Sequence, residues 1–157
     1  LMPYQGTGAA GKLRWVGLTA ALLVYLQSLL GGLVASKWAL HQCFGASQLC
    51  AVMNSHIVGV VPATLATLSV VWMAWRTPAL HTTLRRLANF AGGLVVLQII
   101  LGVATFWLHL QVEPLTVAHQ AIGAALLGVL VAFTVLAFRD YAATSVTNTL
   151  SKNVSST

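Results

Sequence analysis

Four long stretches of the chain carry no charged side chain. The shortest has 22 residues, and the stretches are Trp15–Ser36, Ala51–Trp75, Leu87–Val112 and Leu115–Phe138. A helix needs about 20 predominantly apolar residues to cross the hydrocarbon core of a bilayer. In water, helices that are apolar all round would have no face for the solvent. The sequence therefore predicts an all-α membrane protein, a bundle of four transmembrane helices running up and down.

Charged residues are few and scattered. The 157 residues include eight Lys and Arg and two Asp and Glu, whereas about a quarter of the residues in a soluble domain are charged. Proteins that bind nucleic acids gather their basic residues on one face or arm, but here the cations stand singly or in pairs. This pattern excludes an ordinary soluble domain and a nucleic-acid partner, and it makes membrane lipid the expected surroundings.

The cations also predict how the bundle is oriented. Lys and Arg beside membrane spans stay on the cytoplasmic or matrix side. Lys37 alone lies on one side of the predicted spans, and seven cations lie on the other: Lys12, Arg14, Arg76, Arg85, Arg86, Arg139 and Lys152. We therefore expect both termini inside, in a bacterial cytoplasmic or thylakoid membrane or an organelle inner membrane.

The two ends of the chain differ from the spans. Residues 1–12 are Gly-rich and resemble a linker, and residues 141–157 are polar without an apolar period, which predicts a disordered tail. Residues 13–140 then form one four-helix transmembrane domain. Because the chain starts with Leu and a linker-like segment, we expect it to be processed or part of a longer chain.

A short motif occurs twice. The first predicted helix contains Gln27-Ser-Leu-Leu-Gly31, and the third contains Gln98-Ile-Ile-Leu-Gly102. Each is followed by an outer connection and then by a helix with a histidine early in its span, His56 or His119. The sequence thus predicts two copies of one helical hairpin, with a longer outer loop in the first copy.

The histidines are the strongest candidates for a functional site, because ionisable residues inside a span are costly and usually functional. His56 and His119 both lie about 6–8 Å below the outer boundary, on helices that should face each other across the bundle. Two imidazoles in this arrangement suit the axial positions of a haem iron, and Gly59 and Gly123 leave room for the porphyrin. Alternatively, each histidine only hydrogen-bonds a neighbouring helix.

Four further residues have two interpretations each. Gln27 and Gln98 are amides within the spans that either bond a haem edge or tie helices together. Cys43 and Cys50 lie in the first outer connection, where a disulfide would close a short loop and hold it over the bundle. A redox-active or substrate-relay pair of cysteines is the alternative.

Several segments together resemble the haem A synthase family. They are the stretch from Gln27 to Ala35 before a two-cysteine loop, Met53-Asn-Ser-His56, Gln98 to Thr105, and Val117-Ala-His119-Gln-Ala. The resemblance covers about residues 13–139. It implies a fold of two four-helix halves, each with a histidine pair, and an activity that oxidises a methyl group of haem O to the formyl group of haem A.

Within that family, the chain is similar to the C-terminal half, which implies a b-type haem held by His56 and His119. The substrate-binding half carries a glutamate one turn before its first histidine and an arginine after it, whereas this chain has Met53 and Ile57. We therefore expect an oxidoreductase part that serves electron transfer beside a partner half or in a homo-oligomer, and that is not catalytically complete alone. The alternatives are a non-catalytic haem subunit of a larger respiratory or photosynthetic complex, and a haem-free bundle.

Overall fold

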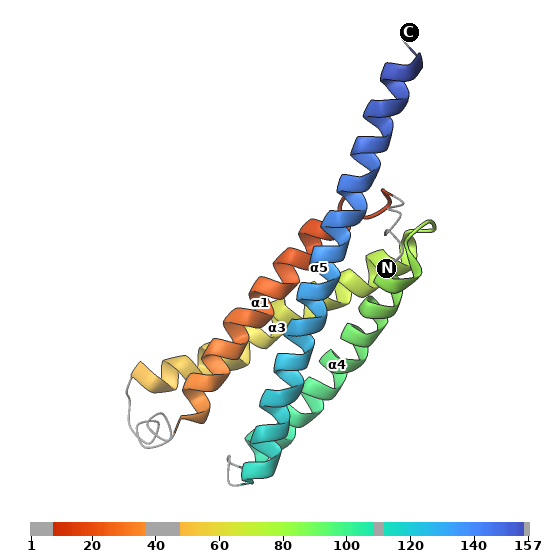
Figure 1. Cartoon of the computed structure of the whole chain (residues 1–157). Helices are drawn as coiled ribbons and strands as arrows, with labels where there is room; N and C mark the ends of the chain where they lie inside the picture. The colour runs from red at the N-terminus through yellow and green to blue at the C-terminus, as the bar shows by residue number, and fades with distance from the viewer. Residues whose placement is uncertain (1–7, 37–47, 109–111, 156–157) are drawn as a thin grey trace.

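The structure is a computed structural model that describes residues 8–36, 48–108 and 112–155, with the backbone alone for residues 48–50 and 144–155. It is all-helical in this part of the chain (Figure 1). The helices are α1 (Leu13–Ala35), α3 (Gln48–Arg76), α4 (Thr82–Trp107) and α5 (Glu113–Ser155). Each contains one of the four charge-free stretches almost completely, so the predicted all-helical fold is confirmed.

Local signals in the sequence explain where two of the helices begin. Nδ1 of His81 accepts a hydrogen bond from the backbone N–H of Thr83 at 3.2 Å and so caps α4. Glu113 is the first residue of α5, where a carboxylate is favourable beside the positive end of the helix dipole. Pro114 follows in the first turn, where the missing N–H costs nothing.

The four helices form a bundle in which each helix has two neighbours. Helix α1 packs against α3 and α5, and α4 packs against the same two helices. Within the described residues, no Cα atom of α3 comes within 8 Å of one of α5. Helices α3 and α5 therefore lie on one diagonal of the bundle, and α1 and α4 lie on the other.

We call the end at which α3 and α5 begin the histidine end, and the other end the opposite end. The contact between α3 and α4 is the least extensive of the four. Figure 1 shows the start of α3 and the end of α4 well apart at the histidine end, while the two helices meet at the opposite end through residues 77–81. The α1–α3 and α4–α5 hairpins thus separate toward the histidine end.

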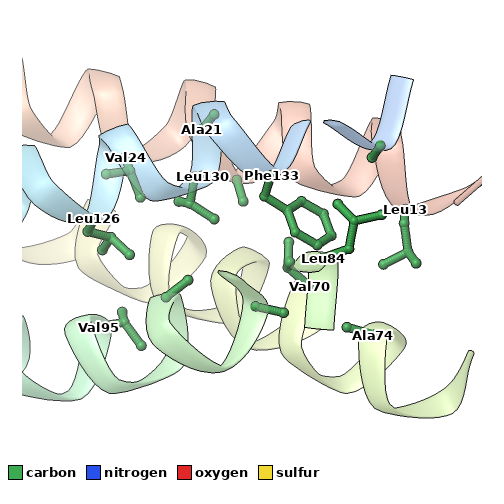
Figure 2. Packing of buried hydrophobic residues seen from close by; sticks show 14 of the residues in the cluster. Leu13, Ala21, Val24, Val70, Ala74, Leu84, Val95, Leu126, Leu130 and Phe133 are labelled. Atoms are coloured by element: carbon green, nitrogen blue, oxygen red, sulfur yellow. The ribbon is translucent and has the colours of Figure 1, made fainter. Parts of the chain in front are cut away.

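Away from the histidine end, a hydrophobic core fills the bundle (Figure 2). Phe133 is its largest fully buried side chain and packs among Leu13, Leu84, Leu130 and Val70, so that all four helices contribute. The close approach of α1 to α5 depends on Gly17. A Cβ atom at that position would lie 2.8 Å from Oγ1 of Thr134 and 2.9 Å from Cδ1 of Phe133.

The buried positions repeat between the two hairpins. Four buried residues of α1 recur in α4 with an offset of 71 residues. In order, Leu13, Gly17, Ala20 and Val24 correspond to Leu84, Ala88, Ala91 and Val95. Four buried residues of α3 recur in α5 with an offset of 63 residues. In order, Ala63, Thr67, Val70 and Ala74 correspond to Leu126, Leu130, Phe133 and Ala137. The same offsets relate Gln27 to Gln98 and His56 to His119. The two offsets differ because the connection between α1 and α3 is longer than the one between α4 and α5.

The outside of the bundle is apolar. Leu26, Leu65, Phe90 and Val117, one from each helix, are between 53% and 63% exposed. In water such a surface would be strongly unfavourable. The segments Leu13–Ala35, Ala51–Arg76, Thr82–Trp107 and Glu113–Ala143 are each long and apolar enough to cross a membrane. The four predicted spans are therefore confirmed by length and composition.

Helix α5 differs from the prediction at its C-terminal end. It continues to Ser155, through residues that we expected to form a disordered tail, and it projects beyond the other helices (Figure 1). The reason is that residues 139–155 contain no Gly or Pro to end the helix. Asp140 consequently lies inside α5 and not beyond it.

Asp140 is also fully buried, which its charge did not suggest. The turn before α1 covers it, because the backbone N–H of Ala10 donates to its carboxylate at 3.3 Å. One residue further, the guanidinium of Arg14 lies 3.6 Å from the ring centroid of Tyr141. These contacts fasten the start of α1 to α5 at the opposite end, far from both histidines.

Replacing Gly17 by Ala tests the contact between α1 and α5. The added methyl group would overlap Thr134 and Phe133, so we expect Gly17→Ala to lower the free energy of unfolding by about 1–3 kcal/mol. Gly128→Ala is the matched control, because nothing lies within 4 Å of a Cβ atom there and Ala favours a helix over Gly by up to about 1 kcal/mol. Denaturation of both variants in detergent measures the difference. Equal stability would contradict the described packing.

Candidate functional site

The packed core stops before it reaches the histidine end. On α1 and α4, the last positions of the regular core are Val24 and Val95, and on α3 and α5 they are Ala63 and Leu126. Beyond them, the only buried residues in the described part of the chain are Thr105 and Gly123. At this end, no large apolar side chain of the described residues is fully buried.

Both candidate histidines lie in this region. His56 precedes Ala63 on α3 by seven residues, and His119 precedes Leu126 on α5 by the same number, so each lies about 10 Å beyond the core. Both side chains are partly buried. Both histidines thus lie at the same end of the bundle, on its diagonal helices α3 and α5.

In the first hairpin, the ring of His56 packs against Gly31 of α1. A Cβ atom at Gly31 would lie 3.0 Å from Cε1 of His56 and 3.6 Å from each ring nitrogen. Any larger residue at this position would push the ring away. The glycine of the repeated motif thus forms a notch for the imidazole.

Gln27 fills a second notch, one turn earlier on α1. Its side chain packs against Gly59 of α3, where a Cβ atom would overlap Oε1 of Gln27. Nε2 of Gln27 donates a hydrogen bond to the backbone carbonyl of His56 at 2.7 Å. Each helix of the hairpin therefore offers a glycine to the polar side chain of the other, and the backbone of His56 is fixed as well as its ring.

The second hairpin repeats this arrangement. A Cβ atom at Gly102 of α4 would lie 3.0 Å from Cε1 of His119, and one at Gly123 of α5 would lie 2.9 Å from Nε2 of Gln98. We call Gln27, Gly31, His56 and Gly59 the first cluster, and Gln98, Gly102, His119 and Gly123 the second cluster. All six predicted residues of the histidine site lie in these two clusters.

The clusters differ in what the glutamine amide contacts. Nε2 of Gln98 lies 3.4 Å from Nε2 of His119, within hydrogen-bonding distance of the ring itself. The other atom of this amide, Oε1, is buried and has no hydrogen-bond partner within the described structure. The amide of Gln27 contacts the backbone of His56 instead of its ring.

Nδ1 is a buried atom in both rings, and in neither does it have a hydrogen-bond partner in the described part of the chain. Unpaired buried polar atoms are rare and call for an explanation. The backbones of Gln27 and Gln98 lie near the rings of His56 and His119. A histidine that binds a metal usually passes its second N–H to a carbonyl or carboxylate. Both histidines are therefore residues that could bind a metal through Nε2.

The described residues contain no group of three or more His, Cys, Asp or Glu that could hold a metal ion. A site built on His56 and His119 alone suits a metal whose other ligands come from a cofactor, as in haem. Cys43 lies outside the described residues, and so does the side chain of Cys50. The predicted disulfide between them thus remains a prediction.

Sequence reasoning missed the role of Gly31 and Gly102. Both glycines belong to the repeated motif, but only the structure shows that each faces a histidine of the neighbouring helix. The available signal was the spacing from Gln to Gly within the motif. Because it equals about one helical turn, it places both residues on the same face.

One of three comparisons with known proteins gave a match. The sequence profile of the COX15-CtaA family, described as cytochrome oxidase assembly protein, matches residues 3–131. The comparison with curated proteins and the one with solved structures each gave no match. The matched segment contains both clusters and most of the four apolar helices. The chain is therefore an integral membrane protein of the COX15-CtaA cytochrome oxidase assembly family, the haem A synthase family.

Proposed function

We propose that the chain holds a b-type haem between His56 and His119 and serves electron transfer in the conversion of haem O to haem A. One observation carries this proposal: two partly buried histidines lie on diagonal helices, at matched positions beyond the end of the packed core. The remaining residues of the two clusters fit the same role.

The clusters support rigid placement of both rings. Gly31 and Gly102 admit the imidazoles at close range, and Gly59 and Gly123 admit the two glutamines. Substituting residues that orient a metal ligand typically costs 10–100-fold in metal affinity. A haem with two imidazole ligands supplies a one-electron carrier whose iron has no open position for a substrate. The chain's contribution is then to hold, orient and shield the rings, in a region that apolar helices surround.

The residues near His56 favour electron transfer over oxidation of a methyl group in this chain. Met53 and Ile57 flank the histidine where the substrate half of the family would have an acid and an arginine. The nearest described carboxylate on α5 is that of Glu113, an exposed side chain at the very start of the helix, and Asp140 lies about 30 Å along α5 from His119. General acid–base chemistry needs a group within hydrogen-bond reach of the reacting atom.

The chain therefore needs a partner that binds the substrate haem. We propose that this partner is a second four-helix half, or another copy of the chain in a homo-oligomer. The partner would lie next to one of the two clusters. The positive-inside rule places both termini inside and the histidine end at the outer face. The position of seven cations at the ends of the spans on the inner side supports this orientation.

A non-catalytic haem subunit is the second candidate function. Helix α3 contains no Asp or Glu, and this favours the second candidate as much as the first, because a pure electron carrier needs no acid or base. It differs from the first candidate in its partner, a larger respiratory or photosynthetic complex. Co-purification with a substrate half that binds haem O would decide for the first candidate.

Removing either histidine tests the proposed haem site. We expect the purified protein to give a bis-imidazole b-type spectrum in reduced-minus-oxidised difference, and pyridine extraction to identify the haem. His56→Ala and His119→Ala should each abolish this spectrum, because each removes an axial ligand. His81→Ala is the control, since His81 caps α4 at the opposite end. A wild-type protein that is folded and cannot bind haem would overturn the proposal.

Two neighbouring glycines of α1 allow a sharper test. Gly31→Val should displace the ring of His56 and lower haem affinity by about 10–100-fold, the range typical for residues that orient a ligand. Gly32→Val is the matched control, because no atom lies within 4 Å of a Cβ atom there. Haem titration followed by absorbance measures both affinities. If both variants bind haem equally well, the notch does not position the ligand.

The proposed disulfide between Cys43 and Cys50 is tested on the intact chain. We expect its mass to rise by a pair of hydrogens after reduction, and a thiol reagent to label the protein only after that treatment. Cys43→Ser should leave one free thiol that reacts without a reductant. Two thiols that react in the untreated wild-type protein would show that the cysteines are not paired.

A further inference from the structure

We infer that the outer surface where α3 meets α4 at the opposite end binds an anionic phospholipid. Arg76 and Arg86 hold its phosphate, Asn89 donates to an ester carbonyl oxygen, and Gly93 leaves space for an acyl chain. This surface lies at the other end of the bundle from both histidines, so the inference does not depend on haem. We call it the lipid patch, and its residues are Trp72, Trp75, Arg76, Arg86, Asn89 and Gly93.

One hydrogen bond joins the two helices in the lipid patch. Nε1 of Trp75 donates to Oδ1 of Asn89 at 2.7 Å, and both side chains are exposed. Arg76 directly follows Trp75, and Arg86 lies about one helical turn before Asn89. Both arginines therefore lie on the side of this bond that is nearer to the connection between the helices. The patch thus combines cations from two neighbouring helices at the end of their spans.

The charges of these two arginines have no acidic partner on their own helices. Both side chains are exposed, and neither α3 nor α4 contains Asp or Glu. Arg86 is the fifth residue of α4, close to the positive end of the helix dipole, where a cation is unfavourable and an anion is favourable. Arg85 differs, because its guanidinium donates to the backbone carbonyl of Thr77 at 2.9 Å. A phosphate diester is the anion that guanidinium groups bind best through paired hydrogen bonds.

The tryptophans place the patch at the level of the lipid headgroups. Trp72 is 62% exposed and Trp75 is 66% exposed, and tryptophan is enriched where a membrane meets water. The guanidinium of Arg76 lies 4.5 Å from the ring centroid of Trp72, which keeps the cation beside the ring. The proposed orientation puts this end on the inner side of the membrane, where basic sites between transmembrane helices bind anionic headgroups.

The deeper part of the patch suits the rest of a phospholipid. Asn89 lies about 4–5 Å further along α4 than Arg86, and its Nδ2 donates to none of the described residues, so it can donate to a glycerol ester. On the same face, Gly93 is exposed and nothing lies within 4 Å of a Cβ atom there. At Gly92, by contrast, a Cβ atom would lie 3.2 Å from Cγ2 of Val71. Helix α4 therefore contacts α3 at one glycine and leaves open space at the next.

The bound lipid would bridge two helices that have little contact of their own. The α3–α4 contact is the least extensive of the four in the bundle, and it is concentrated at this end (Figure 1). A phosphate held by one arginine from each helix adds a link there. We therefore expect the lipid to raise the thermal stability of the protein as well as to bind.

Native mass spectrometry of the full chain in detergent tests the inference. The protein is titrated with dioleoylphosphatidylglycerol or with dioleoylphosphatidylcholine, and we expect tighter binding of the anionic lipid. Arg76→Gln and Arg86→Gln should each lower the affinity for phosphatidylglycerol about fivefold and leave that for phosphatidylcholine unchanged. Both variants should fold, because Gln and Arg have similar helix propensities. Arg139→Gln is the matched control, since Arg139 is an exposed cation on α5 at the same end and outside the patch.

A second pair of variants tests where the acyl chain lies. Gly93→Leu should weaken phosphatidylglycerol binding because its side chain occupies the open space. Gly128→Leu is its control, since nothing lies within 4 Å of a Cβ atom at that exposed position of α5 either. Equal binding by these two variants would contradict the placement of the acyl chain.

The inference is overturned if the two lipids bind the wild-type protein equally well. It is also overturned if Arg139→Gln lowers the affinity for phosphatidylglycerol as much as Arg76→Gln and Arg86→Gln do, because the effect would then be one of overall charge. Glycerol 3-phosphate should not displace the lipid at equal concentration. Displacement would show a site for soluble phosphates and no lipid site.

Discussion

The close approach of helix pairs at glycine is the constraint on which the histidine end depends. An imidazole fits between two neighbouring helices only if the facing position has no side chain, and Gly31 and Gly102 provide this space. The helices are then close enough for Gln27 and Gln98 to reach across in the other direction. Because neither ring has a hydrogen bond at Nδ1 in the described structure, its orientation is fixed by backbone packing more than by polar partners.

The repeat is close in packing but not in polar contacts. Four buried positions of α1 recur in α4, and four of α3 recur in α5, which is what a duplicated hairpin requires to build one shared core. At the histidine end, the same two residue types make different bonds, since Gln27 bonds a carbonyl and Gln98 approaches a ring.

Much of the fold could be predicted from the sequence, since charges are so costly in a bilayer that their positions mark the ends of the spans. The matched depth of His56 and His119 followed from the same boundaries. The end of α5 could not be predicted this way, because a polar sequence without Gly or Pro is compatible with a helix or a coil. Burial of Asp140 depends on Ala10, 130 residues away, and such a contact leaves no local signal. Likewise, the spacing of Gln98 and His119 shows that they can meet but not which atoms do.

The length of α5 has a mechanical consequence. Its 43 residues extend over about 64 Å, whereas a bilayer with its headgroups is about 40–45 Å thick. Roughly 20 Å of this length therefore exceeds the bilayer, on the side of Asp140. The C-terminal part of α5 then lies outside the lipid, beyond the point where the start of α1 contacts α5.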